Sequence, residues 1–287
     1  MINGRPPAIQ RGIAGNDKRN DFRHTIDQRR HSGMTFDTVA DAVSHCGLHR
    51  PKNGVMTVIN THSIYVGYDG REDIAYQVCK YSLQRHSSQQ IAVTPLIQSD
   101  LRSRGLYTRA ADPLASTEFT YTRFLTPYLA GFNGWALFCD CDFLWSGDVA
   151  ELFALADPKK AVMCVHHDHR PDENTKMDGA TQTVYPRKNW SSLMLFNCQH
   201  PANKCLTPEL INRETGAFLH RMQWLDDDLI GALPETWNWL EGWSKKPSSG
   251  YPKAIHFTRG GPWFSNWQHV DYADRWLAEK TALENQQ

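Results

Sequence analysis

Short apolar runs alternate with amphipathic stretches along the chain from Ile64 onward. Each run is too short for a helix of ordinary length and is typical of a buried strand. Strands that alternate with helices indicate an α/β domain, so we expect a mostly parallel sheet with helices on both faces. The predicted strands are 64–68, 91–97, 135–139, 161–165, 192–196 and 254–257.

Helices are predicted where an apolar stripe follows a polar cap. Asp69 to Glu72 fits a helix-opening box ahead of an apolar stripe. The strongest stripe covers residues 121–129, where apolar residues recur at i, i+3, i+4, i+7 and i+8, and Arg123 lies off it. Further helices are expected to begin near Asp148, Thr207 and Tyr272.

The first 55 residues differ in composition from the rest. Up to His31 the chain is rich in Arg, Asn, Asp and Gln, so we expect residues 1–55 to form a disordered or weakly helical tail. A nucleic-acid-binding arm is the alternative, but Asp17, Asp21 and Asp27 dilute its positive charge. A single domain is expected over residues 56–287.

The composition narrows the class of protein. Lysine plus arginine and aspartate plus glutamate each number 31, so the net charge is zero and no global field favours nucleic acid. The 7 cysteines include no Cys-x-x-Cys pair, and several lie in apolar runs, as free thiols in a reducing compartment do. We therefore expect a cytoplasmic protein. The sequence shows no run long enough for a transmembrane segment and no signal peptide.

Two carboxylates directly follow the apolar run 135–139, with Asp140 and Asp142 one residue apart. Ligands of open parallel sheets bind beyond the carboxyl ends of the strands, so these side chains are expected at the rim of a cleft. Carboxylates at i and i+2 can converge on one hard divalent cation, and such a cation can bind a diphosphate. The simpler alternative is that both residues only end a strand.

Several short motifs follow one another in order between residues 62 and 267. They are Gly67-Tyr68-Asp69, Arg123 within 121–127, Asp140-Cys141-Asp142, the 191–197 strand, Asp226-Asp227-Asp228-Leu229, and 256–263 with its His, Gly and Pro-Trp. This series resembles the family 8 glycosyltransferases, which are retaining enzymes that use nucleotide sugars. The resemblance implies a GT-A-like (Rossmann-like) α/β fold.

The resemblance also implies a role for each matched residue. Asp140, Asp142 and His256 would hold a divalent cation, with Mn²⁺ preferred over Mg²⁺ because the ligands mix oxygen and imidazole. Asp69 would hydrogen-bond a uracil base, or act only as a helix cap. Arg123 would approach the diphosphate, or form only a surface ion pair. The implied nucleotide-sugar-binding residues are Tyr68, Asp69, Arg123, Asp140, Cys141, Ser191, Arg259 and Gly260.

The chain departs from that family at three places. The lysine of the family's His–Gly–Lys-Pro-Trp segment is absent, and Arg259 is the available positive charge. An asparagine of the family falls on Trp190 by strict spacing, one residue after an asparagine of this chain. The glutamine of the family's Asp-Gln-Asp is Asp227 here. Asp227 and Asp226 are therefore the candidate catalytic residues, with a solvated helix start as the alternative.

A second group of polar side chains, His166, His167, Asp168 and His169, follows the predicted strand 161–165. A second metal site is one hypothesis, but adjacent histidines of a strand point in opposite directions, so a loop that contacts the acceptor is favoured. The sequence leaves open whether three tryptophans form a sugar-stacking platform or part of the core: Trp237, Trp239 and Trp243.

The resemblance implies metal-dependent transfer of a hexose from a nucleotide-diphosphate sugar, preferably a UDP-sugar, to a carbohydrate or other hydroxyl acceptor, with retention. One alternative is a metal-dependent phosphoesterase or nucleotidyltransferase that uses the same carboxylates. Another is a non-catalytic sugar-binding module. The sequence leaves the sugar, the acceptor and the oligomeric state open.

Overall fold

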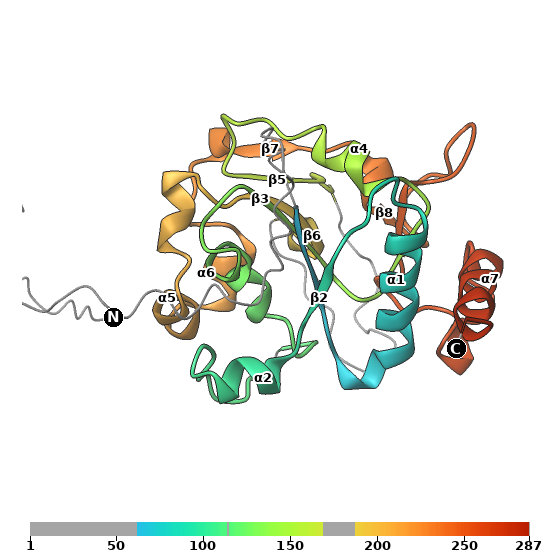
Figure 1. Ribbon diagram of the computed structural model, residues 1–287, viewed down its shortest axis with the longest axis horizontal. Helices are drawn as coiled ribbons and strands as arrows, with labels where there is room; N and C mark the ends of the chain where they lie inside the picture. Colours follow the sequence, from blue (N-terminus) through green and yellow to red (C-terminus); the bar gives the residue numbers. More distant parts are fainter. Residues whose placement is uncertain (1–61, 114, 169–186, 287) are drawn as a thin grey trace, which may run out of the picture. The chain divides into compact units, whose positions relative to one another are not determined.

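The computed structural model describes residues 62–113, 115–168 and 187–286. The tail expected over residues 1–55 lies outside these residues, and so does His169. Within the described residues the chain forms two sheets with helices packed around them (Figure 1).

The larger sheet has the strand order β2-β1-β3-β6-β5-β7. β6 runs antiparallel to both of its neighbours, and the other pairings are parallel, so the expected mostly parallel sheet is confirmed. The carboxyl ends of β1, β3, β5 and β7 therefore lie at the same edge, where β6 begins. The strands are β1 (Ser63–Gly67), β2 (Val93–Leu96), β3 (Trp135–Cys139), β5 (Val162–Cys164), β6 (Leu193–Asn197) and β7 (Ile230–Ala232).

The central strands β3 and β6 are apolar because both of their faces are covered. Residues 136–139 and the whole of β6 are buried. A strand covered on both faces has an uninterrupted apolar run instead of alternating polar and apolar residues. This is why the predicted strand 135–139 coincides with β3.

A smaller sheet of order β4-β9-β8 follows from the larger one through residues 140–142. β9 pairs antiparallel with β4 and parallel with β8. Of these strands the sequence predicts only β9. β4 and β8 have 3 and 2 residues, too few to show a period. The strands are β4 (Phe143–Trp145), β8 (Trp239–Leu240) and β9 (Ala254–His256).

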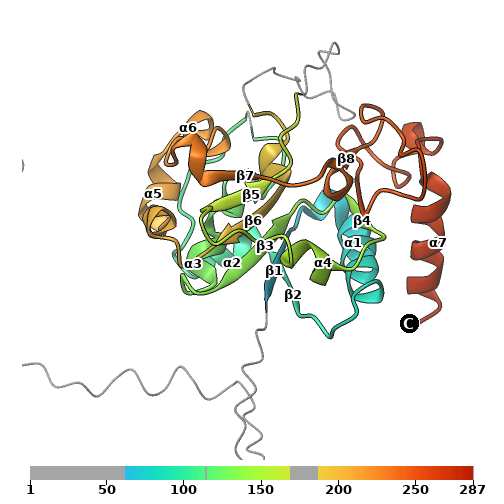
Figure 2. The ribbon, with the colours of Figure 1, turned by 90° about the horizontal axis from the view of Figure 1, so that it is seen from above.

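Helices cover the larger sheet on both faces. α1 and α7 lie on one side and α3, α5 and α6 on the other (Figure 2). The α-helices are α1 (Asp73–Arg85), α2 (Gln98–Ser103), α3 (Thr126–Leu129), α4 (Val149–Phe153), α5 (Pro208–Arg213), α6 (Gly216–His220) and α7 (Ala273–Glu284). The 3-10 helices are η2 (Gly70–Glu72), η3 (Thr122–Leu125), η4 (Trp190–Ser192), η5 (Pro201–Cys205), η6 (Asp227–Leu229), η7 (Glu235–Trp237) and η8 (Ser265–Trp267).

The stretch 121–129 departs from the single amphipathic helix expected there. It forms the 3-10 helix η3 and then the short helix α3, with Pro127 in the first turn of α3. Proline has no backbone N–H to continue a helix from the preceding turn, so the chain starts a new one. In this geometry Arg123 is buried instead of lying on the face away from the core.

Our first prediction concerns Gly67, the last residue of β1. A Cβ at this position would lie 2.4 Å from Cγ of the buried Phe119. Gly67→Ala should therefore lower the free energy of unfolding by about 1–3 kcal/mol, measured by urea denaturation. Gly70→Ala is the matched control, because its Cβ would meet no atom within 4 Å. Equal unfolding midpoints for the two variants would show that the Phe119 ring can move aside for the added methyl group without loss of stability.

Candidate functional site

Three side chains converge at the edge of the larger sheet where β3 ends. Asp140 and Asp142 lie between β3 and β4, and His256 ends β9. Each offers a ligand atom, and these atoms lie within 4.8 Å of one another. The β4–β9 pairing sets Phe143 opposite His256, and so brings Asp142 to the imidazole. Among the described residues this is the only group of acidic, histidine and cysteine side chains arranged to hold a metal ion.

The orientation of the His256 ring suits a metal ligand. Its Nδ1 lies 3.0 Å from Oδ1 of Asn238, and its Nε2 lies 3.4 Å from Oδ1 of Asp142. The Asn238 amide nitrogen donates to the carbonyl of Asn189, which fixes Oδ1 as the atom facing the ring. Nδ1 therefore carries the proton, and the Nε2 lone pair points towards the carboxylates. A ligating histidine is commonly held in this way.

One turn supports both halves of this group. In the 3-10 helix η4 (Trp190–Ser192), the Ser192 carbonyl accepts from the backbone N–H of Asp140, and the Ser192 hydroxyl binds the Asn238 amide. The Ser191 carbonyl accepts from Arg123. Displacing this turn would therefore disturb Asp140 and His256 together.

The guanidinium of Arg123 is buried against Asp140. Its Nη1 donates to Oδ1 of Asp140 at 2.7 Å, and its side chain lies near the rings of Phe119 and Phe138. The sequence suggested a diphosphate contact or a surface ion pair, and the structure shows a buried ion pair. Breaking such a pair leaves an uncompensated charge, so Arg123 fixes the position of the Asp140 carboxylate.

Two acidic side chains, Asp69 and Glu72, follow β1 at the same edge. Asp69 is fully buried, and its oxygens accept from the Arg71 backbone, the Arg71 guanidinium and the Glu118 backbone. Burial opposes its ionisation, but these hydrogen bonds outweigh that effect and hold the pKa of Asp69 below its usual range. The helix-cap prediction is confirmed, because Asp69 caps η2. Neighbouring Tyr68 donates its hydroxyl to Asp73.

Sequence reasoning missed Glu72. Its side chain is buried, and Oε2 has no hydrogen-bond partner within the described part of the chain. Burial raises its pKa to about 8, with contributions from the negative charges of Asp142 and Asp69. In the sequence Glu72 is only a polar residue at a helix start. Nothing there indicates that its side chain is buried near Asp140 and Asp142.

The other predicted nucleotide-sugar-binding residues occupy different environments. Cys141 and Gly260 are buried, and burial raises the pKa of the Cys141 thiol well above its usual value. Ser191 is buried with its hydroxyl 2.8 Å from Nδ1 of His220. Arg259 forms an ion pair with the buried Glu241 and lies over the rings of Trp243 and Trp267.

The candidate catalytic residues Asp226 and Asp227 lie at the start of η6. Both are exposed, and Asp226 takes the N-cap position without a side-chain cap hydrogen bond. The Asp227 carboxylate forms an ion pair with Arg187, whose guanidinium also lies over the Trp190 ring. Arg187 therefore links Asp227 to the turn that carries Ser191 and Ser192.

His166 and His167 face different surroundings, as adjacent residues of an extended segment do. His166 stacks on Trp190 with ring centroids 4.0 Å apart, and burial lowers its pKa. The two histidines form no metal-binding group with other described residues. Of the three tryptophans left open, Trp237 and Trp239 are buried in the core, whereas Trp243 is partly exposed.

Comparison with known proteins places the chain in a family. No protein-family signature matches it. Protein CDI of Arabidopsis thaliana is 58% identical over 219 residues, which cover 75% of this chain and 85% of the plant protein. The chain belongs to the Protein CDI family.

The fold of this CDI-family chain is also found in glycosyltransferases of known structure. GlyE of Streptococcus pneumoniae TIGR4 is 15% identical with a TM-score of 0.53, and the match covers 78% of this chain and 63% of GlyE. The bifunctional glycosyltransferase WbbM is 16% identical with a TM-score of 0.50, over 81% of this chain and 53% of WbbM. The chain thus spans less than two thirds of either structure. At these identities the likeness shows the fold alone, and it confirms the expected GT-A-like architecture.

Within the described ranges, no helix of this CDI-family chain combines the length and apolar character needed to cross a bilayer.

Our second prediction concerns metal binding by the isolated protein. Asp140→Asn and Asp142→Asn each remove an anionic ligand and should abolish Mn²⁺ binding in isothermal titration calorimetry. Asn238→Ala should weaken binding by about 10- to 100-fold, because it frees the His256 ring to rotate. Asp274→Asn, at an exposed position of α7, is the control. Equal Mn²⁺ affinity in all four variants would contradict the assignment.

Proposed function

We propose that this CDI-family protein is a metal-dependent glycosyltransferase that transfers a hexose from a nucleotide-diphosphate sugar, preferably a UDP-sugar, to a hydroxyl acceptor. The observation that carries the proposal is the convergence of Asp140, Asp142 and His256 at the carboxyl end of β3. They lie at the edge of a GT-A-like sheet, where open parallel sheets bind ligands.

The donor set fits a divalent cation. Two carboxylates and one neutral imidazole nitrogen suit Mn²⁺, and Asn238 holds the imidazole in the required tautomer. When bound, the cation would neutralise the charge that develops on a departing diphosphate. Arg123 acts through Asp140, because its contacts hold that carboxylate and the turn behind it.

The proposed reaction exchanges one C–O bond for another. The bond from the anomeric carbon to the diphosphate oxygen breaks, and the nucleoside diphosphate leaves with the electron pair. A bond forms between the anomeric carbon and the acceptor oxygen, and the hydroxyl proton is released to solvent. The resemblance to the family 8 enzymes supports retention at the anomeric carbon.

The donor's base is proposed to lie near Tyr68 and Asp69, at the carboxyl end of β1. The base contact of Asp69 is proposed from the family 8 resemblance, and the bonds from Arg71 and Glu118 hold its carboxylate at the end of β1. Arg259 is the proposed substitute for the family's missing lysine, with Glu241 holding its guanidinium in place. The proposed donor site is completed near Asp140 by three further residues: Cys141, Ser191 and Gly260.

Two other functions remain as alternatives. A phosphoesterase or nucleotidyltransferase would use the same carboxylates and would consume nucleotides or phosphate esters without moving a sugar. A non-catalytic sugar-binding module would bind glycans without turnover. The complete Asp140, Asp142 and His256 group favours an enzyme over the binding module.

Our third prediction concerns the donor. UDP should bind more tightly than GDP or ADP in calorimetry, and only with Mn²⁺ present. Asp69→Ala should reduce this preference by about one hydrogen bond, ~1 kcal/mol. A screen of UDP-hexoses with Mn²⁺ should show hexose transfer or slow donor hydrolysis. Equal affinity for the three nucleotides would refute base recognition, and phosphate-ester cleavage without sugar release would favour the phosphoesterase.

Our fourth prediction concerns Asp227 as the group that stabilises or attacks the anomeric carbon. A carboxylate can serve as nucleophile or as charge stabiliser towards an oxocarbenium-like sugar. Asp227→Asn should lower the single-turnover rate at least about 100-fold while UDP affinity changes little. Asp228→Asn is the matched control, since it is the exposed neighbour in the same turn.

Asp226→Asn tests the competing orientation, in which Asp226 faces the donor. A slow Asp226→Asn enzyme with a normal Asp227→Asn enzyme would transfer the role to Asp226. Product stereochemistry, followed by NMR, tests retention directly, and an inverted product would reject it.

A further inference from the structure

Glu72 differs from the other buried acidic side chains. Four acidic residues are buried in the described part of the chain, and three of them have hydrogen-bond or ion-pair partners on both carboxylate oxygens. Those three are Asp69, Glu241 and Glu279. Glu72 is only 6% exposed, and its Oε2 has no hydrogen-bond partner among the described residues. Buried polar atoms are nearly always hydrogen-bonded, so such an exception points to a group that binds there.

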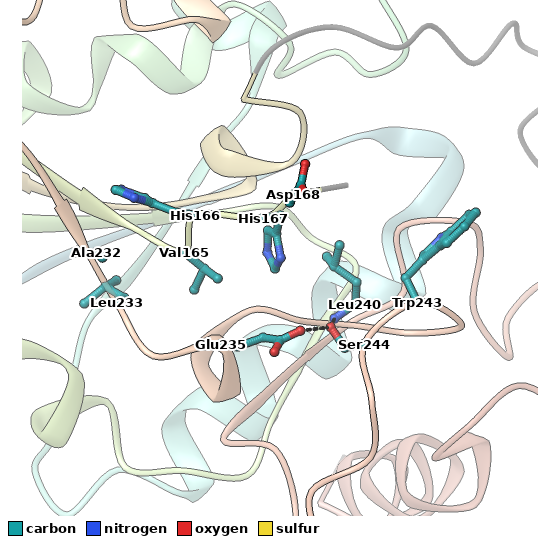
Figure 3. A pocket seen from close by; sticks show the side chains of 10 residues that line it. All are labelled: Val165, His166, His167, Asp168, Ala232, Leu233, Glu235, Leu240, Trp243 and Ser244. Atoms are coloured by element: carbon teal, nitrogen blue, oxygen red, sulfur yellow. Dashed lines mark hydrogen bonds between the residues drawn. The ribbon is translucent and has the colours of Figure 1, made fainter. Parts of the chain in front are cut away.

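Other acidic side chains at this edge of the larger sheet have such partners. Glu235 lines a cavity of about 540 Å³ beyond β5 and β7, and its Oε1 accepts a hydrogen bond from Ser244 (Figure 3). Asp69, in the turn that precedes Glu72, receives four hydrogen bonds from Arg71 and the Glu118 backbone. Glu72 Oε2 therefore keeps an acceptor position that no described residue fills.

The start of α1 places Glu72 beside the metal group. Glu72 is the N-cap residue of α1, and α1 packs against β4, which directly follows Asp142. Seven residues later, on the same side of the helix, the Cys79 thiol donates to the carbonyl of Asp140. Raised pKa values agree with this position. After burial, Asp142 contributes most to the raised pKa of Glu72, and Glu72 contributes most to that of Cys141.

Glu72 lies outside the set of direct metal ligands. The ligand atoms of Asp140, Asp142 and His256 lie within 4.8 Å of one another, and Glu72 does not belong to this group. Mn²⁺ prefers about six ligands, so three protein side chains would leave positions for water or for a substrate oxygen. Water on a divalent cation is a strong hydrogen-bond donor, because the cation draws electron density from it. Polar groups too far apart for direct contact are commonly bridged by such a water.

We propose that Glu72 is an outer-sphere ligand of the cation, with its buried carboxylate accepting a hydrogen bond from a water molecule that the cation carries. This inference rests on the proposed function and adds a positioning residue to its metal site. Glu72 orients that water and adds a negative charge beside the cation, as outer-shell carboxylates of metal sites do. The remaining coordination positions are then left for the diphosphate of the donor.

The test measures Mn²⁺ binding to the full chain without a nucleotide. Glu72→Gln keeps the size of the side chain and removes its charge, so it should weaken Mn²⁺ affinity about tenfold in isothermal titration calorimetry. Glu72→Ala should weaken it at least as much. Glu118→Gln is the matched control, because Glu118 is an exposed acid whose backbone contacts Asp69 at the same edge. Normal Mn²⁺ affinity in both Glu72 variants would overturn the proposal.

Two further measurements separate this role from a structural one and from direct ligation. Without metal, Glu72→Gln should unfold at nearly the same urea concentration as the unmodified protein, because it replaces a group whose Oε2 has no protein partner. A marked loss of stability in the metal-free variant would make the weaker binding a folding effect and would reject the proposal. Water-proton relaxation reports how many water molecules Mn²⁺ carries. An unchanged number in Glu72→Gln is expected, and a larger number would make Glu72 a direct ligand instead.

Failure of this inference can be told apart from failure of the proposed function. If Mn²⁺ binding depends on Asp140 and Asp142 but not on Glu72, the metal site stands and the role of Glu72 falls. Weaker Mn²⁺ binding in the Glu72 variants stands even if UDP-hexoses are not turned over. If Glu72→Gln changes the preference for UDP over GDP while Mn²⁺ affinity stays normal, Glu72 contacts the base, and the outer-sphere role is rejected.

Discussion

The ion pair between Arg123 and Asp140 makes the proposed metal group possible. Asp69, Glu72, Asp140 and Asp142 all lie near one edge of a buried sheet, where water screens their charges poorly. Buried carboxylates are stable only when cations or hydrogen-bond donors compensate them. Arg71 compensates Asp69, and Arg123 compensates Asp140. A divalent cation held by Asp140, Asp142 and His256 would add further positive charge at this edge.

The turn Trp190–Ser192 connects the Arg123–Asp140 ion pair to His256. Its carbonyls bind Arg123 and the Asp140 backbone, and its Ser192 hydroxyl binds the Asn238 amide that orients His256. The turn precedes β6, the strand that runs opposite to its neighbours in the larger sheet. Because β6 is antiparallel, its beginning lies at the edge where β3 ends. A parallel strand at this position would bring its carboxyl end there instead.

The sequence predicts the parts of this site that depend on local pattern. The run 135–139 coincides with β3, and the caps at Asp148 and Thr207 are found as expected, since each depends on neighbouring residues alone. The association of His256 with Asp140 and Asp142 came from resemblance, because no local pattern joins residues so far apart in the chain.

The features that sequence reasoning missed depend on long-range packing. The sequence pattern places Arg123 off the apolar stripe, as for a surface residue. In the structure η3 directs its side chain into the core, towards Asp140, 17 positions further along the chain. Asn238 and Glu72 have no distinctive neighbours, and their importance appears only when β8 lies beside β9 and when α1 begins beside Asp142. The short strands β4, β7 and β8 are held by their partners in the sheets and carry no period of their own.

The smaller sheet has a consequence for how firmly His256 is held. His256 lies between Phe143, which stacks on its ring at 4.5 Å, and its other register partner, the buried Leu240. The imidazole therefore cannot move towards either neighbour without disturbing a packed row. Asn238 prevents its rotation by holding Nδ1. A ring held in this way would keep the Nε2 lone pair directed at the two carboxylates, so a bound cation and the diphosphate on it would occupy one fixed position, and a fixed position of the reacting groups favours transfer.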